Sequence, residues 1–465
     1  MSKHQMNSAD AAWLHMDRPT NLMVVNSVLW FDEPVDIERG KDIVRERLVE
    51  RFPRFRQRIV EPRLGGGVPS WEDDPKFDFD RHIHHIALPA PGDRVALQEL
   101  VGDLISTPLD RSKPLWDLYV IDGYGAGMAL VWRMHHCIAD GIALVRVLLS
   151  MTDEQPDAGI QPEGDGKPGS GRLDVLARPL TVGAHLAGAT MHEGFTLLTH
   201  PRPELRGLAS RTAADARALG KLLFTPPDRK TVLRGELGVA QKVTWTERIA
   251  LEDVKAIGQA TGTTVNDVLV AAMTGALHHY LVRRHSLVDE LRAMIPFNLR
   301  LPDEPLPREL GNRFGLVYLE LPVGMRGPRQ RLEEVHRRMD SIKHSPEGAV
   351  AYGILGLIGL TPPQVEQRLI DMFSSKSTAV MTNVPGPREP VYFAGTRVAG
   401  VVGWVPAAGA MGLGISIFSY SGAVTVGLRV DAGVVPDPET IIDAFEHELE
   451  VLARLRPRPT SKPTT

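Results

Sequence analysis

The sequence has almost no cysteine, since Cys137 is the only one in 465 residues. A single cysteine excludes an intramolecular disulfide and any zinc or iron–sulfur site built on several thiolates. An excess of one charge is also missing, because 53 Lys and Arg oppose 57 Asp and Glu, for a net charge of -4. The basic field that attracts nucleic acid is therefore absent, and no nucleic-acid partner is expected. We expect a reducing, cytoplasmic location.

Long hydrophobic runs are missing as well. The two longest apolar stretches, residues 268–277 and 354–360, are shorter than the roughly 20 residues that span a bilayer. The first residues lack the apolar core of a secretory signal, and neither terminus carries a site for myristoylation or prenylation. These absences predict a soluble protein, or at most one attached to the surface of the inner membrane or of a lipid droplet.

What is present is an ordinary globular composition, with 43% hydrophobic and 24% charged residues. The chain is about three times as long as a typical domain, so we expect two large lobes. Residues 153–171 contain almost no large apolar side chain, which indicates a linker. The predicted organisation comprises an N-terminal lobe at 1–152, a linker with crossover helices at 153–238, a C-terminal lobe at 239–455 and a disordered tail at 456–465.

Hydrophobic periodicity predicts mixed strands and helices in both halves. Runs rich in β-branched and aromatic residues predict strands at 24–31, 77–88, 116–121, 128–134, 241–245, 291–297, 315–321, 377–382, 397–404, 412–420 and 423–430. Amphipathic stretches predict helices at 36–52, 94–105, 141–149, 251–261, 264–284, 329–343, 363–372 and 438–455. Ser421 and Gly422 predict a hairpin turn between the last two strands. The predicted fold class is therefore α+β, in two halves around a cleft.

The strongest candidate for chemistry is the segment from His135 to Gly141, which reads HHCIADG. It stands where a predicted strand ends and a predicted helix begins. Because neighbouring strand residues point to opposite faces, His135 and His136 cannot play the same role. We expect one imidazole to face the cleft as a general base, since a pKa of about 6.5 suits that work. Asp140 and Gly141 suit a tight turn at a helix N-terminus.

Two other chemistries compete for this segment. Metal ligation by both histidines and Asp140 would resemble a two-histidine, one-carboxylate site, but neighbouring strand side chains diverge, so we expect no metal. Cys137 could act as a nucleophile beside His136. The same divergence separates its thiol from the imidazole, and a buried inert thiol fits better. A second histidine cluster, His82, His84 and His85, lacks a following Asp-Gly pair, and we expect it to lie mid-strand on a sheet surface.

The seven residues resemble the HHxxxDG signature of the CoA-dependent acyltransferase superfamily. Further motifs, in order along nearly the whole chain, resemble those of the bacterial wax ester synthase/diacylglycerol acyltransferase family. They are residues 8–14 (SADAAWL), Pro114-Leu115-Trp116, Asn266-Asp267, Gly311-Asn312 and Asn383-Val384-Pro385-Gly386-Pro387. The chain departs from the family pattern at Asp17, at residues 22–24, and at Phe297 and Asn298. These departures bear on the preference for acyl chain and acceptor.

The resemblance implies two lobes of the chloramphenicol-acetyltransferase type with the active site in a tunnel between them. It implies transfer of a long-chain acyl group from acyl-CoA to the hydroxyl of diacylglycerol or a fatty alcohol, without a cofactor. His136 would take the proton of the acceptor hydroxyl, and Asn266, beside Asp267, would donate to the oxyanion. Asp140 would form a salt bridge that fixes the turn, with Gly141 permitting it.

The supporting motifs also have structural interpretations. Trp116 suits packing near the site, Asn266 can simply cap its helix, and residues 383–387 suit a rigid loop. Residues 173–224 mix apolar and basic side chains, which suits either a lipid-facing element or a helix that bridges the lobes.

Two alternative functions stay open. A related acyltransferase could use another alcohol or a carrier-protein thioester, although no carrier domain adjoins the chain. A catalytically inactive lipid-binding or droplet protein could share the fold, but the presence of both His136 and Asp140 argues against it.

Overall fold

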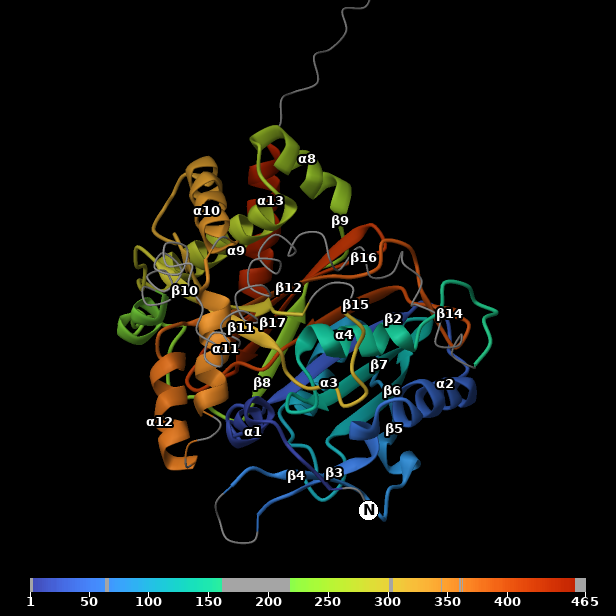
Figure 1. Ribbon diagram of the computed structural model, residues 1–465. Coiled ribbons are helices and arrows are strands. Elements are labelled where there is room, and N and C mark those ends of the chain that lie inside the picture. The colour runs from blue at the N-terminus through green and yellow to red at the C-terminus, as the bar shows by residue number, and fades with distance from the viewer. Residues whose placement is uncertain are drawn as a thin grey trace, which may run out of the picture.

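The computed structural model describes residues 3–62, 67–160, 218–300, 304–343, 345–358, 361 and 363–455. The predicted linker beyond residue 160, most of the lipid-facing or bridging element at 173–224, and the predicted tail lie outside the described residues. Strands and helices are mixed in both halves of the chain, and they build two large sheets (Figure 1). The predicted α+β class is confirmed.

The first sheet has the strand order β15-β2-β7-β6-β5. Its strands are β2 (Val24–Phe31), β5 (Ile83–Ala87), β6 (Trp116–Tyr124), β7 (Gly127–His135) and β15 (Gly400–Trp404). Strand β15 comes from the second half of the chain and pairs antiparallel with β2, with Trp404 opposite Asn26. The two lobes therefore exchange backbone hydrogen bonds, which sets a limit on how independently they can fold.

The second sheet has the order β11-β10-β12-β16-β17-β8, with β9 paired to β17. Its strands are β8 (Gln241–Trp245), β9 (Ile249–Ala250), β10 (Leu291–Asn298), β11 (Phe314–Leu321), β12 (Ala379–Pro385), β16 (Leu413–Tyr420) and β17 (Ala423–Asp431). The predicted hairpin turn between β16 and β17 is confirmed, since Ser421 and Gly422 have φ angles of 45° and 73°. Positive φ at both central residues is the requirement of a type I′ turn.

Smaller sheets and the helices complete the described fold. Two small sheets contain β1 (Lys3–Gln5), β3 (Gln57–Val60) and β4 (Ser70–Asp73), and β13 (Tyr392–Phe393) with β14 (Thr396–Arg397). The helices in the first half are α1 (Ser8–His15), α2 (Ile37–Val44), α3 (Arg94–Ile105) and α4 (Gly141–Ser150). Those in the second half are α8 (Leu251–Thr261), α9 (Val265–Arg283), α10 (Pro328–Lys343), α11 (Glu347–Ile358), α12 (Pro363–Ser374) and α13 (Glu439–Ala453).

The helices cover the sheets unequally. Helix α9 is buried along most of its length because α8, α10 and α13 pack around it (Figure 1).

A cluster of indole rings joins the two sheets. The ring centroid of Trp245 of β8 lies 6.4 Å from that of Trp30 and 5.9 Å from that of Trp404. Apolar burial of this kind, about 25 cal/mol for each Å² removed from water, holds the lobes together.

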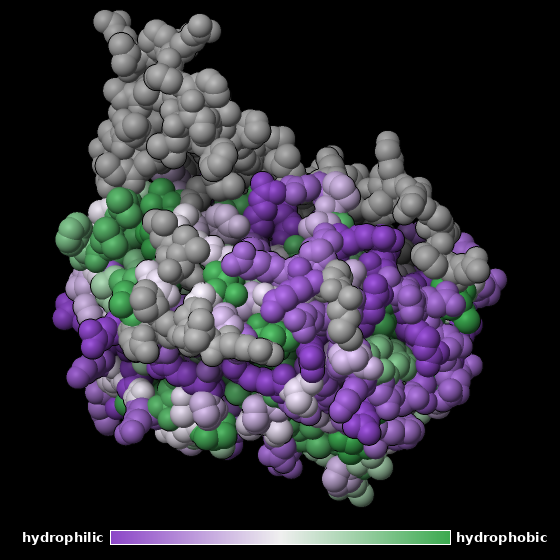
Figure 2. Space-filling view, turned by 60° about the horizontal axis from the view of Figure 1, so that its bottom comes forward, coloured by the Kyte–Doolittle hydropathy of each residue, from purple (hydrophilic) through white to green (hydrophobic). Residues whose placement is uncertain are grey.

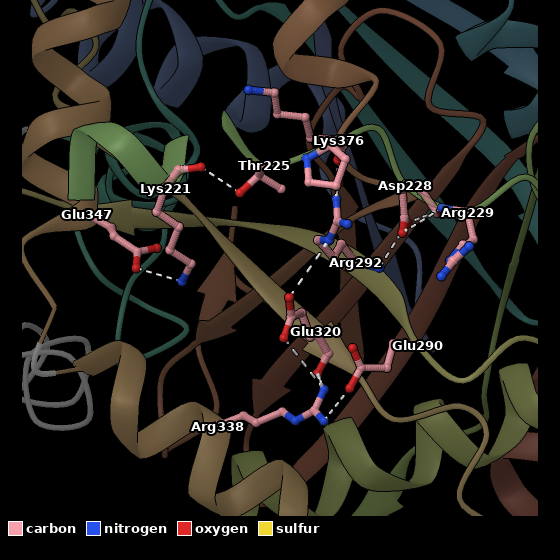
Figure 3. A network of polar contacts seen from close by, with 12 residues as sticks. Lys221, Thr225, Asp228, Arg229, Glu290, Arg292, Glu320, Arg338, Glu347 and Lys376 are labelled. Atoms are coloured by element: carbon pink, nitrogen blue, oxygen red, sulfur yellow. Dashed lines mark hydrogen bonds and ion pairs between the residues drawn. The ribbon is translucent and has the colours of Figure 1, made fainter. Parts of the chain in front are cut away.

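The described residues resume at position 218. Polar contacts attach the segment that follows to the second half of the molecule (Figure 3). Asp228 Oδ2 accepts the backbone N–H of Arg292 at 2.9 Å and the hydroxyl of Thr378 at 2.6 Å. The Arg292 guanidinium donates to the carbonyls of Pro226 and Lys376, at 2.8 Å each. This network anchors the crossover to the second sheet and is a structural feature.

The expectation for His82 is wrong. Its ring is 1% exposed, lies in a short 3-10 helix before β5, and stacks on Trp116 at 4.5 Å between centroids. The strand predicted at 77–88 begins only at Ile83, because Phe79–His82 form this 3-10 helix, in which Phe79 packs against Trp116. His84 and His85 do lie on β5, at its partly exposed surface.

Candidate active site

The HHCIADG segment lies where β7 ends and α4 begins, as the sequence predicts. His135 is the last residue of β7, and Asp140 is the N-cap of α4. The Asp140 Oδ1 atom accepts the backbone N–H of Ala143 at 2.8 Å, which satisfies one of the free donors at the helix start. A Cβ atom on Gly141 would come within 3.1 Å of the Val405 side chain, so the turn leaves little space there.

The second carboxylate oxygen of Asp140 reaches the other lobe. Oδ2 lies 3.2 Å from Nη2 and 3.4 Å from Nε of Arg300, and it accepts the backbone N–H of Arg313 at 3.1 Å. Asp140 and Arg300 are both buried, at 2% and 5% exposure. The implied salt bridge of Asp140 is confirmed, and its partner follows the end of β10. A paired, buried carboxylate of this kind fixes the turn.

The imidazole of His136 is held between aromatic rings. Trp13 of α1 stacks on it with 4.2 Å between centroids, and Phe314 of β11 lies at 5.5 Å. The backbone N–H of His136 donates to the Met23 carbonyl at 2.7 Å, and its carbonyl accepts Nδ2 of Asn312, also at 2.7 Å. Within the described residues Nδ1 of His136 is buried and has no hydrogen-bond partner. The ring is therefore fixed by packing and by its main chain.

Burial determines the charge of His136. It lowers the pKa to about 4, and the nearby Asp140 carboxylate opposes this only in part. The imidazole is therefore neutral at neutral pH, which is the state that a general base needs.

His135 points elsewhere and has other partners. Its Nδ1 accepts the backbone N–H of Cys137 at 3.1 Å, and its Nε2 lies 3.7 Å from Oδ2 of Asp17. Burial raises the pKa of Asp17, but His135, the Met23 N–H and Arg111 together outweigh it and lower the pKa to about 2. The different faces of the two histidines agree with strand geometry, and His135 supports the segment from behind.

The competing chemistries find no support in the geometry. Cys137 is fully buried, and burial raises its pKa well above the usual value, so it is not a thiolate. Across the described ranges, no three His, Cys, Asp or Glu side chains gather in a way that could hold a metal ion.

The Gly311-Asn312 motif lies directly behind His136. The N–H of Gly311 donates to the Ile138 carbonyl at 3.0 Å, and its φ of 98° is in the region that favours glycine. Asn312 donates to Oδ1 of Asp10 from its backbone N–H at 2.9 Å and from Nδ2 at 2.8 Å. A Cβ on Gly311 would lie 3.3 Å from Asp10 Oδ2, so the loop passes close to α1.

The Pro114-Leu115-Trp116 motif supports the same strand end. The Leu115 carbonyl accepts the backbone N–H of His135 at 3.0 Å. Trp116 is fully buried, and its Nε1 donates to the Phe55 carbonyl at 2.8 Å. The packing interpretation of this motif agrees with these contacts.

The remaining motifs form a second group. The Nδ2 of Asn383 donates to Oδ1 of Asn266, so the two motifs meet at the start of α9. Asp267 closes a capping box with Thr264 and contacts Nδ1 of His336 at 2.7 Å. Just after β12 and Pro385, Gly386 donates its N–H to the Ser419 carbonyl at 2.7 Å. Among the described residues no hydrogen bond or ion pair joins this group to His136, and the oxyanion role of Asn266 stays a prediction.

An apolar cavity of about 70 Å³ lies between the lobes, next to the motif. Its lining includes Met134 and Gly141 on either side of the histidines, Leu144 of α4, and Val384, Val401 and Phe418 from the second half. The cavity is narrow and almost entirely apolar, which suits a hydrocarbon chain.

Several site residues were not predicted as such. Asp10 and Trp13 belong to the N-terminal motif, and Arg300 follows the departures at Phe297 and Asn298. Neither of these sequence signals indicates which residues contact each other in the fold. Met23 lies among the departures at residues 22–24, and Phe314 carries no sequence signal at all. Only the fold brings these residues to His136.

The fold is similar to that of solved two-lobed transferases. A wax ester synthase/diacylglycerol acyltransferase from Marinobacter aquaeolei superposes with a TM-score of 0.67, at 22% identity, over 96% of this chain and 98% of that one. The first condensation domain of the calcium-dependent antibiotic synthetase gives 0.56, at 17% identity, over 99% and 98%. The fold is thus the two-lobed α+β fold that these solved proteins share.

Sequence comparison identifies the family. The model of the wax ester synthase/diacylglycerol acyltransferase catalytic domain matches residues 6–269, and that of the family's C-terminal domain matches residues 310–453. The chain belongs to this family. Two relatives in Mycobacterium tuberculosis are assigned as diacylglycerol O-acyltransferases, each 28% identical, one over 96% of this chain and 90% of its own, the other over 86% and 84%.

Proposed function

We propose that this acyltransferase moves a long-chain acyl group from acyl-CoA to the hydroxyl of diacylglycerol or of a fatty alcohol. The observation that carries the proposal is the neutral, buried imidazole of His136 in a motif whose Gly141 lines an apolar cavity between the lobes. The names of the relatives support both acceptors, since they include diacylglycerol O-acyltransferases and a wax ester synthase.

The chemistry needs one base and no covalent enzyme intermediate. His136 accepts the proton of the acceptor hydroxyl while that oxygen attacks the thioester carbonyl of acyl-CoA. A positioned base contributes about 10² to 10⁴-fold. The tetrahedral intermediate collapses with cleavage of the carbon–sulfur bond, and the imidazolium returns its proton to the CoA sulfur. Asn266 is the proposed donor to the oxyanion, a contribution of about 3–4 kcal/mol for a single donor.

The acyl chain has an apolar place near the base. We assign it to the cavity lined by Met134, Leu144 and Phe418, which extends from the motif between both lobes. Burying a hydrocarbon chain there contributes about 0.8 kcal/mol for each methylene group. The two lobes enclose the cavity, which keeps water away from the thioester.

We also propose peripheral contact with a lipid surface. Residues 218–224, which follow the crossover, expose Phe224 at 85% and Leu219 and Leu223 at 39% each. Figure 2 shows apolar surface at one edge of this face and in smaller patches elsewhere on a largely polar surface. None of the helices in the described ranges is long and apolar enough to cross a membrane. Exposed apolar side chains on a helical segment suit attachment at an interface.

The proposal is tested with purified protein, palmitoyl-CoA and either diacylglycerol or hexadecanol. Free CoA thiol and the neutral lipid are measured, and we expect thiol release that depends on the acceptor and disappears in His136→Ala. His85→Ala is the matched control, because His85 is an exposed histidine on β5 that should leave the rate unchanged. Lipid binding without turnover would contradict the proposal and favour a non-catalytic lipid-binding protein.

A further inference from the structure

Helix α1 and the loop at residues 311–314 hold His136 from two sides. Trp13 stacks on the imidazole from α1, and Phe314 contacts both Trp13 and the imidazole, at 5.6 Å and 5.5 Å between centroids. Asn312, two residues before Phe314, donates to the His136 carbonyl at 2.7 Å. The position of the base therefore depends on how these two segments are fixed to each other.

Asp10 makes the polar connection between the two segments. Its Oδ1 accepts two N–H groups of Asn312, at 2.8 Å and 2.9 Å, from a position on α1 one helical turn before Trp13. Both residues are 3% exposed, so these hydrogen bonds are shielded from water. A buried amide that loses its acceptor pays the full desolvation penalty, and Asn312 would then move with the His136 main chain that it holds.

Asp10 does not need its charge for this work. Burial raises its pKa to about 7, against the lowering effect of the hydrogen bonds from Asn312. A neutral side chain of the same shape with a carbonyl oxygen would serve the two N–H groups equally well. The hydrogen-bond geometry, and not the ionisation, is what the site requires at this position.

We propose that Asp10 is a positioning residue for acyl transfer, acting through Asn312 on the main chain of His136 and through α1 on the stacked Trp13. This inference rests on the proposed function. A displacement of the reacting groups by about 1 Å can cost 10²-fold in rate. Loss of the Asp10 acceptor should therefore lower kcat. The KM for acyl-CoA should stay the same, because Asp10 is 3% exposed and does not line the apolar cavity.

The test compares Asp10→Ala with Asp10→Asn in the full-length protein. We expect Asp10→Ala to lower kcat by about 10- to 100-fold with an unchanged KM for palmitoyl-CoA, and Asp10→Asn to keep kcat within about threefold of wild type, because its oxygen still accepts both N–H groups. Asp228→Ala is the matched control, since Asp228 is also a buried carboxylate with one oxygen, Oδ2, that accepts two donors (Figure 3). It should lower the melting temperature and leave kcat per folded molecule unchanged.

Two further measurements separate positioning from general destabilisation. Asn312→Ala should lower kcat as Asp10→Ala does, and the double variant should lose no more than either single one, because the two residues act as one unit. The Asn312 variant also carries the test if Asp10→Ala fails to fold. A crystal structure of Asp10→Ala, or of Asn312→Ala in that case, should show His136 displaced from Trp13.

The outcomes distinguish the two proposals. A wild-type protein that releases no thiol with any acceptor would overturn the proposed function. An active wild type with an equally active Asp10→Ala would overturn the role of Asp10 alone. Three other results would also overturn it. They are equal losses of kcat in Asp10→Asn and Asp10→Ala, additive losses of kcat in the double variant, and a similar fall in kcat in Asp228→Ala.

Discussion

His136 shows how an ordinary side chain becomes a base suited to a dry site. Its ring lies between Trp13 and Phe314, and the same burial that protects the reaction also removes the stabilising solvent from the imidazolium. The ring must therefore receive its proton only transiently. The Asp140 carboxylate is close enough to raise the pKa somewhat, but it is already paired with Arg300. The site thus keeps the resting base neutral and still gives the imidazolium some electrostatic support.

The pH dependence of the reaction should report this environment. Because burial lowers the pKa of His136 to about 4, the base loses its proton-accepting form only below that pH. The acid limb of kcat/KM should therefore fall near pH 4, whereas a solvent-exposed histidine would give a limb near about 6.5. Initial rates across the acidic range, corrected for folded protein by circular dichroism, measure it. A limb at the ordinary histidine value would show that His136 is solvated or is not the base.

At the scale of elements, the turn from β7 to α4 depends on both carboxylate oxygens of Asp140. One caps α4, and the other binds Arg300 and the Arg313 N–H. Asp140→Asn should leave the buried guanidinium unpaired, which costs about 3–5 kcal/mol, so activity should fall together with the melting temperature. Thermal unfolding and activity are measured on the same samples. Lost activity at an unchanged melting temperature would contradict this structural role.

A matched N-cap separates capping from ion pairing. Asp93 caps α3 by accepting the Ala96 N–H at 2.9 Å, and its position is exposed. Asp93→Ala should cost only about 1 kcal/mol, the usual loss of a helix cap, with activity retained. Asp140→Asn keeps a side-chain oxygen for the cap, so its larger loss would come from the ion pair. A loss in Asp93→Ala far above about 1 kcal/mol would contradict the ordinary energy of a helix cap.

Helix α9 leaves no space for a larger side chain where it contacts α10 and α13. A Cβ on Gly275 would overlap the side chains of Glu448 and Arg331, which form a buried ion pair. Gly275→Ala should therefore destabilise the protein by about 1–3 kcal/mol, although alanine is the better helix former. Gly353 of α11 is the control, because nothing lies within 4 Å of its Cβ position, and Gly353→Ala should stabilise by about 0.5–1 kcal/mol. Denaturant unfolding measures both, and a stabilising Gly275→Ala would contradict the packing argument.

Two elements have the bounds predicted from sequence. The helix at 94–105 buries one face, which its apolar residues mark by their helical spacing. The strand at 24–31 is a short run rich in β-branched and aromatic residues and is buried on both faces. The helix at 347–358 is missed. Its sequence, EGAVAYGILGLI, is apolar on most sides and contains three glycines, so neither the helix period nor the strand period stands out. Its glycines include Gly348, whose carbonyl would overlap a Cβ on Gly315 of β11.

The site follows the same rule at a larger scale. The HHCIADG segment is local, so its strand-to-helix turn can be predicted from consecutive residues. The partners of that segment are distant in sequence, as for Arg300 with Asp140 and Asn312 with His136. Such contacts arise because the two lobes pack together. The hydrophobic periodicity of a single segment does not predict which residues of another lobe it will contact. Family motifs point to the regions involved but not to the pairs.

For the whole molecule, the exchange of β15 makes the two lobes interdependent. The predicted division at 1–152 and 239–455 separates β2 from β15, one of the two strands that pair with it, because β15 belongs to the second half. Trp404 of β15 and Trp245 of β8 also fill the space beside Trp30. A chain that ends at residue 160 would therefore expose the β2 edge and lose part of its core.

Such a shortened chain should fail to fold independently. We expect no cooperative thermal transition from residues 1–160 alone, and aggregation through the open edge of β2, because the missing strand supplies both hydrogen bonds and buried indole surface. Full-length protein should unfold in one transition that coincides in far- and near-ultraviolet circular dichroism. Adding a peptide that covers residues 396–405 to the shortened chain should restore part of its structure by pairing with β2. A cooperatively folded 1–160 chain would show that the N-terminal lobe is self-sufficient and that β15 only joins it afterwards.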